Sequence, residues 1–270
     1  MDTQETGPLK NTGTADPVEI VYYTDPLCCW SWAMESQWRK LRYQFQQHLK
    51  WRYCMGGLLP SWNHFTDGVN SVSRPAQMGP IWMEASHISG MPISNRIWVN
   101  DPPASSYLAC IAVKCAQLQS PELGDKYLRL LREAVMLHDK NIATQNVLVQ
   151  LAEQLSEKSA HEFDMKLFQE DLVNDRGLEA FRQDLNEVQS RGIHRCPTFI
   201  FRRAAHTPLL LTGYRPYATL LEVMKQLLPE VELSQQPIDD EAYLTYWSTL
   251  TKRELEEAVA PHEVLKKLPV

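Results

Sequence analysis

The chain has 270 residues, of which 44% are hydrophobic and 22% charged, and its formal net charge is −6 at pH 7. This composition is ordinary for a folded protein, and its mixed, slightly acidic charge argues against nucleic acid or an anionic membrane as the main partner. No apolar run approaches the ~20 residues that cross a bilayer, and residues 1–16 lack the basic start and apolar stretch of a secretory signal. We therefore expect a cytoplasmic protein without a membrane partner, whose residues 1–16 form a disordered tail.

The first elements predict a strand, a helix and a second strand. Residues 18–23, VEIVYY, form a β-branched and aromatic run that is typical of a buried strand, and Asp25-Pro26 ends it. Residues 28–48 favour one helix, because their apolar side chains recur at helical spacing. Residues 50–55 alternate as a second strand, which Gly56-Gly57 ends. The connection is long enough for the two strands to be parallel.

A long helical block is predicted in the middle of the chain. Residues 60–104 are rich in Pro, Trp and Ser and indicate a long loop with short helices. From Ser105 the pattern becomes helical, and the predicted helices are residues 107–118, 126–137, 144–155, 163–174 and 178–190.

Strand character returns near the end. Residues 198–201, TFIF, and residues 209–212 form a hairpin pattern, and residues 216–228 a helix with proline in its first turn. Residues 241–259 form one amphipathic stretch, in which Thr251 and Glu254 have the spacing of a capping box. The order βαβ, helical block, ββα predicts an α/β fold whose small mixed sheet is split in sequence by a helical insertion.

The stretch DPLCCWSW places Cys28 where the first strand meets the first helix. A helix N-terminus has unpaired N–H groups and a partial positive charge, so a thiol there ionises more readily, and the thiolate is the nucleophile. This position predicts that Cys28 is an exposed, acidic and reactive thiol. The alternative is a buried cysteine that packs as a small hydrophobic residue.

DPLCCWSW after a strand and CPTFIF after a helical block resemble the DsbA family of thioredoxin-fold proteins, and within it the cytoplasmic FrnE-like and ClpXP-adaptor (YjbH/SpxH-like) branch. The resemblance covers roughly residues 18–228. It implies a thioredoxin-like domain of residues 17–60 and 191–228, a helical insertion domain of residues 61–190 and a C-terminal helical extension of residues 229–270.

The family pattern implies roles for individual residues. In the family, D-P-x-C-x-x-C opens the first helix, and a Pro-Thr after the insertion carries a cis peptide bond that faces the active cysteine. Cys28 matches the nucleophile and Pro197 the cis-proline, which implies a thiol–disulfide oxidoreductase or isomerase. Ser31 occupies the place of the resolving cysteine. Serine cannot attack a mixed disulfide, although its hydroxyl can donate to a Cys28 thiolate. We therefore predict a monothiol, C-x-x-S mechanism.

Two other cysteines are candidates to replace the missing thiol. Cys29 is adjacent to Cys28, and Cα atoms ~3.8 Å apart are too close for an unstrained disulfide, which prefers about 4.4–6.8 Å. Cys196 precedes the expected cis-proline, which in this fold lies against the active-site helix. Cys196 is therefore an alternative resolving thiol, a soft-metal ligand with Cys28 and His194, or a packing residue. The remaining cysteines, Cys54, Cys110 and Cys115, are expected to pack in the core.

The substrate is expected to be a protein or small-molecule thiol or disulfide, with glutathione as a co-substrate and no metal or other cofactor. We assign substrate contact to Trp30, Pro197 and Cys29, because Trp30 would form one wall of an apolar groove. Asp25 either caps the first helix or tunes Cys28.

Two further functions stay open. The kappa-class glutathione transferases and 2-hydroxychromene-2-carboxylate isomerases have a similar run at this place and share the Ser31-Trp32 pair. The adaptor branch instead binds another protein and delivers it to a protease without catalysis. Under this alternative, the helical insertion and residues 241–259 of this chain would supply the binding face. A homodimer is also open, because these folds often pair.

Overall fold

The computed structural model describes residues 16–65, 67, 70–159, 162–231 and 237–260. The disordered tail expected over residues 1–16 lies, except for Asp16, outside the described residues. Among the helices that are described, none is both long enough and apolar enough to pass through a bilayer.

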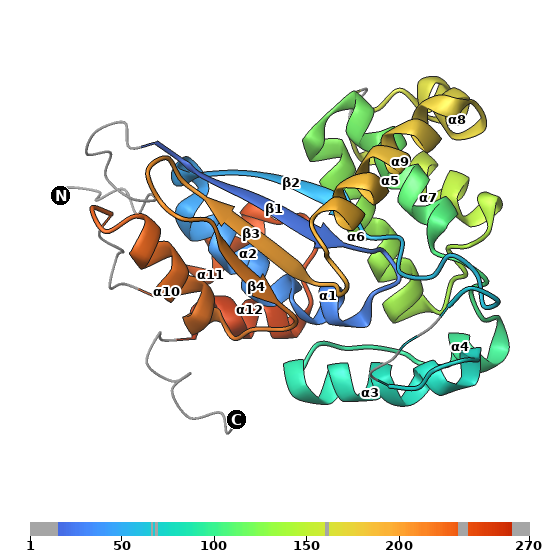
Figure 1. The fold of residues 1–270 in the computed structure, drawn as a ribbon, viewed down its shortest axis with the longest axis horizontal. Helices are drawn as coiled ribbons and strands as arrows, with labels where there is room; N and C mark the ends of the chain where they lie inside the picture. Colours follow the sequence, from blue (N-terminus) through green and yellow to red (C-terminus); the bar gives the residue numbers. More distant parts are fainter. Residues whose placement is uncertain (1–15, 66, 68–69, 160–161, 232–236, 261–270) are drawn as a thin grey trace. The chain divides into compact units, whose positions relative to one another are not determined.

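Four strands form one sheet in the order β2-β1-β3-β4 (Figure 1). They are β1 Val18–Thr24, β2 Leu49–Met55, β3 Thr198–Arg202 and β4 Leu209–Thr212. All residues of β1 except Glu19 are buried, as expected for an inner strand with a continuous apolar run. β3 and β4 are neighbours joined by residues 203–208, which confirms the hairpin. The predicted βαβ, helical block, ββα order is confirmed.

The chain packs as two compact units. The first contains the described residues up to Val21, residues 34–51 and those from Phe199 onward. The second contains residues 22–33 and 52–198. Strands β1, β2 and β3 contribute residues to both units. The domain boundaries inferred from the sequence follow motif positions rather than packing, and they stay predictions.

The first unit builds its core on α2 Glu35–Phe45, which the 3-10 turn Gln46–His48 follows. Trp38 of α2 is fully buried, and its ring lies 5.6 Å from that of Phe199 and 6.1 Å from that of Trp51. Helix α10 Tyr217–Leu227 also packs on α2. Pro216, which the sequence placed in the first turn, is instead the N-cap residue that precedes it.

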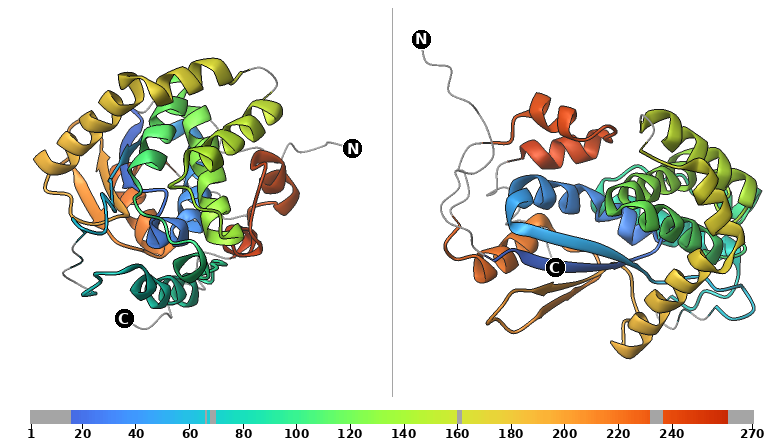
Figure 2. Two further views of the ribbon diagram at one scale, coloured as in Figure 1. Left: turned by 90° about the vertical axis from the view of Figure 1, so that its right-hand side faces the viewer. Right: turned by 90° about the horizontal axis from the view of Figure 1, so that it is seen from above.

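The amphipathic stretch predicted over residues 241–259 forms two helices. They are α11 Asp240–Tyr246 and α12 Lys252–Val259, which lie beyond α2 when seen from the strands (Figure 2). The capping box predicted at Thr251 and Glu254 is confirmed, and it explains the break, since a capped N-terminus begins a new helix at Lys252.

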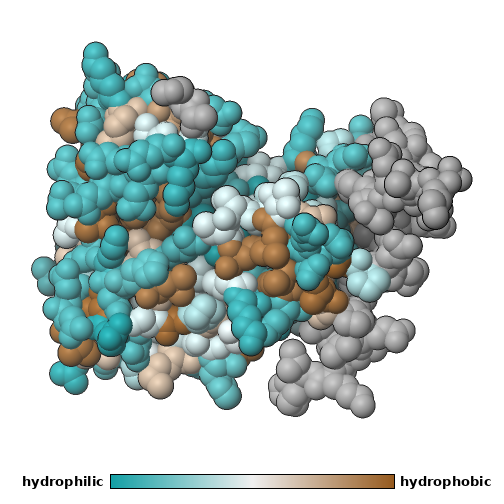
Figure 3. All heavy atoms as spheres, turned by 180° about the vertical axis from the view of Figure 1, so that it is seen from behind, coloured by the Kyte–Doolittle hydropathy of each residue, from teal (hydrophilic) through white to brown (hydrophobic). Residues whose placement is uncertain are grey.

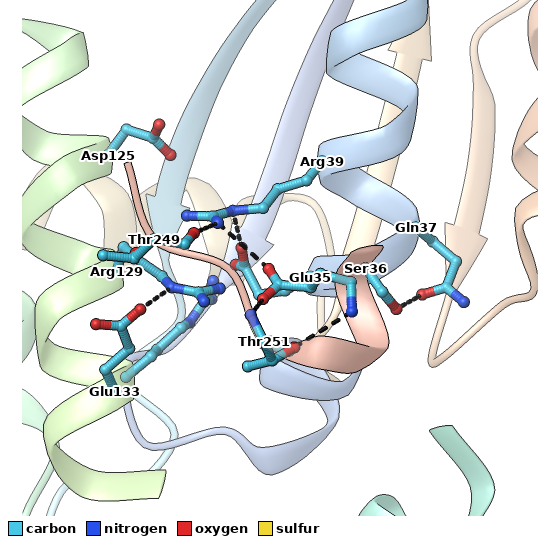
Figure 4. A network of polar contacts seen from close by, with 12 residues as sticks. Glu35, Ser36, Gln37, Arg39, Asp125, Arg129, Glu133, Thr249 and Thr251 are labelled. Atoms are coloured by element: carbon cyan, nitrogen blue, oxygen red, sulfur yellow. Dashed lines mark hydrogen bonds and ion pairs between the residues drawn. The ribbon is translucent and has the colours of Figure 1, made fainter. Parts of the chain in front are cut away.

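Arg39 of α2 binds these C-terminal helices. Its guanidinium donates to the Thr249 carbonyl at 2.5 Å and lies 3.3 Å from both Glu35 and Glu254 (Figure 4). The three charged side chains are nearly inaccessible to solvent. The C-terminal helices are thus fixed to α2 by a buried ionic cluster, here named the Arg39 cluster (Arg39, Glu35 and Glu254).

The second unit is mostly helical. Its helices are α1 Cys29–Ala33, α3 Met78–Ser89, α4 Ile97–Asn100, α5 Tyr107–Gln119, α6 Pro121–His138, α7 Gln145–Lys158, α8 Met165–Val173 and α9 Asp175–Ser190, with a 3-10 turn at Pro75–Gln77. Five of them confirm the predicted helical block. Helix α3 is longer than the short helices expected over residues 60–104, because Pro80 falls in its first turn, where a missing N–H leaves no hydrogen bond unmade.

The one helix predicted over residues 28–48 is interrupted. Helix α1 ends at Ala33 and α2 begins at Glu35, with Met34 between them. Neither glycine nor proline marks this interruption in the sequence, and so the apolar spacing alone could not reveal it.

Candidate functional site

Cys28 occupies the N-cap position of α1. Its carbonyl accepts the first helical hydrogen bond, from the Trp32 amide at 3.1 Å, while its own amide donates to the Asp25 carbonyl at 3.1 Å. Its sulfur accepts the Ser31 N–H at 3.4 Å, as an N-cap side chain does. The predicted place of Cys28, at the junction of strand and helix, is confirmed.

The prediction of an exposed and acidic Cys28 is wrong. Only 4% of its surface is accessible. Burial raises the pKa of the Cys28 thiol, because water no longer solvates the thiolate. The Ser31 hydroxyl and amide oppose this rise in pKa, Asp25 adds to it, and Arg132 lowers it by the smallest amount. A helix of five residues supplies too little positive potential to offset desolvation.

The Cys28 sulfur faces the loop at Pro197, as predicted. The Cys196–Pro197 peptide bond is cis. The Cys28 thiol donates to the Cys196 carbonyl oxygen at 3.5 Å. Residues far apart in the sequence therefore meet at the sulfur. All six cysteines, Cys28, Cys29, Cys54, Cys110, Cys115 and Cys196, are free thiols.

Gly56 makes room for Cys196, and the sequence did not reveal this role. A Cβ atom at position 56 would lie 2.7 Å from the Cys196 sulfur, a separation that such atoms do not tolerate. The Gly56 amide donates to the Thr24 carbonyl at 2.7 Å, which fixes the end of β2 beside β1. The sequence had shown Gly56 only as the end of a strand.

Asp25 does not cap α1, so that prediction is wrong. Its carboxylate is fully buried and accepts hydrogen bonds from four donors. The donors are the amides of Leu27 at 2.8 Å and Leu58 at 2.7 Å, the Ser106 hydroxyl at 2.8 Å and the Cys110 thiol at 3.3 Å. Burial raises the pKa of the Asp25 carboxyl, and the four donors counteract that rise. Asp25 therefore ties the turn before Cys28 to the segment after β2 and to α5.

Cys110 was expected only to pack, but the structure gives it this polar contact with Asp25. The sulfur of Cys54 donates to the Asp184 carbonyl at 3.6 Å inside the core. Cys115 is fully buried beside Gly177. Cys29 is 3% exposed. Burial is the larger cause that raises the pKa of its thiol well above the ordinary value, and the nearby Cys28 raises this pKa further.

The aromatic residues of α1 differ in exposure. Trp30 is partly exposed, whereas Trp32 is buried, with its indole N–H donating to the Pro92 carbonyl at 2.9 Å. The Arg129 guanidinium lies 4.6 Å from the centre of the Trp32 ring. Trp30 is thus the aromatic side chain of α1 that a substrate at Cys28 can reach, and its contact with substrate stays a prediction.

Ser31 is fully buried, and its hydroxyl has no hydrogen bond of good geometry among the described residues, although it is near enough to the Cys28 sulfur to affect that thiol. It lies on the same turn as the Cys28 sulfur and lowers the pKa of that thiol. The hydroxyl is therefore placed to donate to a thiolate once one forms. Among the residues whose positions are described, no three His, Cys, Asp or Glu side chains gather as a metal site, so Cys28, Cys196 and His194 do not form the alternative metal set.

The sequence matches the family model described as "Thioredoxin" over residues 22–222. The ClpXP adapter protein SpxH of Halalkalibacterium halodurans is 28% identical over 230 residues, which are 84% of this chain and 73% of that protein. The solved structure of the cytosolic disulfide reductase DsbM from Pseudomonas aeruginosa has a TM-score of 0.60 at 18% identity and covers 77% of this chain and 99% of its own. The solved structure of a 2-hydroxychromene-2-carboxylate isomerase has a TM-score of 0.55 at 15% identity, and the match covers 78% of this chain and 97% of the isomerase chain.

These matches confirm the resemblance inferred from DPLCCWSW and CPTFIF. The family match and the two solved structures also confirm the predicted thioredoxin-like fold class. On the match over residues 22–222, with its N-capping cysteine opposite a cis-proline, this chain belongs to the thioredoxin family.

Proposed function

We propose that this protein carries out thiol–disulfide exchange through Cys28, which forms a mixed disulfide with a protein or small-molecule disulfide. The observation that carries the proposal is the position of the Cys28 sulfur. It accepts the Ser31 amide of the helix that it begins and donates to the carbonyl beside cis-Pro197. A substrate disulfide that reaches this sulfur also reaches the backbone of the cis-proline loop.

The environment of Cys28 favours reduction of a substrate disulfide over oxidation of a substrate thiol. Strongly oxidising thiol proteins stabilise the thiolate of their reduced form. Burial has the opposite effect on Cys28, because it raises the pKa of the thiol. A thiolate of higher pKa is also the stronger nucleophile once it has formed. The site is therefore suited to attacking disulfides at a rate that increases with pH.

Oxidised glutathione tests this proposal. We expect the full-length protein to release glutathione from it, faster as the pH rises through the alkaline range, and Cys28→Ser to abolish the release. Cys115→Ser is the matched control, since Cys115 is buried in the helical core, and it should react like the wild type. Equal rates for wild type and Cys28→Ser would exclude the proposal. The same assay with an electrophilic glutathione acceptor tests the transferase alternative.

A second candidate is a binding function of the adapter type. Its support is the 28% identity to a ClpXP adapter protein over 84% of this chain, together with serine at position 31. Exposed apolar side chains offer contact surface, among them Met83, Ile88 and Val99 on α3 and α4 and Leu244 on α11. Figure 3 shows hydrophobic patches on an otherwise hydrophilic face.

Purified ClpXP tests the adapter candidate. Equal, saturable binding of wild type and Cys28→Ser would establish a binding function that is independent of the thiol. Absence of binding in both proteins would exclude it.

A further inference from the structure

We propose that Cys196 is the resolving thiol of this site, so that Ser31 does not leave the protein with a monothiol mechanism. This inference rests on the proposed exchange chemistry of Cys28. It assigns the second half of the reaction to a residue of the cis-proline loop instead of the first helix. Cys28 and Cys196 are 168 residues apart in the sequence. A local motif such as C-x-x-C therefore cannot reveal that they form a pair.

The first support is proximity. The Cys28 sulfur lies 3.5 Å from the Cys196 carbonyl oxygen. Standard backbone bond lengths then place this sulfur within about 6 Å of the Cys196 Cα. The Cα of Cys28 is two bonds further from this contact, so the two Cα atoms lie within about 9 Å of each other. A disulfide needs Cα atoms about 4.4–6.8 Å apart, and a loop movement of about 2 Å at most brings the pair into that range.

The second support is the space that holds the Cys196 sulfur. The Cys196 sulfur lies against Gly56, and a side chain at position 56 would occupy the same space as this sulfur. Cys196 as a whole is only partly exposed. The Cys196 sulfur therefore has a defined position beside the end of β2, on the residue whose carbonyl contacts the Cys28 sulfur.

The electrostatics of the pair suit an attack that follows substrate capture. Burial raises the pKa of the Cys196 thiol well above its ordinary value, with further increases from the nearby Cys28 and Asp25. The increase due to Cys28 arises because two neighbouring thiolates repel each other. It disappears once Cys28 is held in a mixed disulfide, since that sulfur can no longer carry a charge. Cys196 therefore ionises more readily after Cys28 has reacted.

The chemical steps balance. The Cys28 thiolate attacks a substrate disulfide R–S–S–R, forms the Cys28–S–S–R bond and releases one thiolate, which is protonated to RSH. The Cys196 sulfur then attacks the Cys28 sulfur, forms the Cys28–Cys196 disulfide and expels the second thiolate, which takes the Cys196 proton. One substrate disulfide is reduced to two thiols, and two protein thiols are oxidised to one disulfide. An external dithiol or glutathione regenerates the protein.

The other cysteines are less suited to this step. Cys29 is adjacent to Cys28, and the short Cα separation across one peptide bond strains a disulfide. Cys110 donates a hydrogen bond to the Asp25 carboxylate, and Cys54 donates one to the Asp184 carbonyl. Cys196 is the cysteine whose backbone already contacts the Cys28 sulfur.

The test treats full-length protein with oxidised glutathione, blocks remaining thiols with an alkylating agent, and analyses intact masses and peptides. Wild type should release two glutathione molecules per chain and contain a Cys28–Cys196 crosslink. Cys196→Ser should release one and retain glutathione on Cys28. Cys196→Ala, which lacks the serine hydroxyl, should behave like Cys196→Ser, and Cys115→Ser should behave like the wild type.

Two failures can be told apart. Retention of glutathione on Cys28 in wild type, to the same extent as in Cys196→Ser, overturns the role of Cys196 but leaves the exchange at Cys28 intact. No reaction of Cys28 in any variant overturns both proposals. Circular dichroism of each variant shows that the fold is preserved, so neither result can be attributed to unfolding.

Discussion

The C-terminal helices and the thiol site both contain buried ionisable groups. The two regions differ in whether an opposite charge lies beside each buried group. In the Arg39 cluster, each buried charge lies against an opposite charge, and Arg253 pairs with Glu257 at 2.5 Å in the same way. At the thiol site, no described basic side chain forms an ion pair with Asp25, and Cys28 has only a small favourable contribution from Arg132. The first arrangement holds elements together, whereas the second disfavours the charged form of the sulfur atoms.

The largest expected loss of folding stability comes from removing the positive charge of the Arg39 cluster. Arg39→Met removes the cation that Glu35 and Glu254 share, both of which stay buried. Breaking a buried ion pair from one side costs about 3–5 kcal/mol of the free energy of unfolding, and here two buried carboxylates lose the same cation. Urea denaturation measures the loss.

The matched control is Arg182→Met. Arg182 pairs with Glu179 at 3.7 Å, and the two side chains are 57% and 58% exposed. Exposed pairs contribute about 0–1 kcal/mol, so this variant should unfold nearly like the wild type. If Arg39→Met were as stable as Arg182→Met, the Arg39 cluster would not hold the C-terminal helices to α2.

Lys40 extends this comparison, because it is a buried charge that contacts no carboxylate among the described residues. Its ammonium donates to the carbonyls of Glu257 at 2.7 Å and Ala260 at 3.2 Å, at the C-terminal end of α12. Burial lowers the pKa of Lys40 from 10.5 to about 8, although Glu257 opposes the change.

The sign of the resulting pH dependence follows from this lowered pKa. Between pH 10.5 and about 8 the unfolded chain binds a proton at Lys40 that the folded chain does not. Stability should therefore rise with pH across this window, by about 3 kcal/mol for a shift of this size. The difference in unfolding free energy between wild type and Lys40→Met, measured from pH 7 to 11, isolates this part. A difference that stays constant with pH would contradict it.

The same contrast explains what the sequence could and could not predict. The strands, the helical block, the Thr251 capping box and the meeting of Cys28 with the Pro197 loop follow from local pattern and from a recognised motif order. The acidity of Cys28 does not, because desolvation depends on side chains from distant elements. A five-residue helix also carries less dipole than the longer helix that the sequence predicted.

The sequence also could not predict hydrogen bonds between residues that are far apart along the chain. Asp25 looked like a helix cap because it precedes α1, yet its donors come from Leu58, Ser106 and Cys110 as well as from its own turn. Gly56 looked like a strand terminator, since nothing nearby in the sequence shows that a sulfur from residue 196 lies against it. The sequence therefore identified the position of Cys28 beside the Pro197 loop but not the environment that sets the pKa of its thiol.

The smallest expected effect probes that environment directly. Gly56→Ala places a methyl group 2.7 Å from the Cys196 sulfur, which must move. Overpacking of this kind costs about 1–3 kcal/mol. In a Cys196→Ala background the sulfur is absent, and the cost of Gly56→Ala should fall, giving a coupling energy of about 1 kcal/mol in a double-mutant cycle. Gly79→Ala, whose Cβ would meet no atom closer than Asn95 Nδ2 at 3.6 Å, is the control and should be neutral or slightly stabilising within α3. Additive effects of Gly56→Ala and Cys196→Ala would mean that Gly56 does not hold the sulfur in place, and Cys196 would then lack the fixed position from which it reaches Cys28.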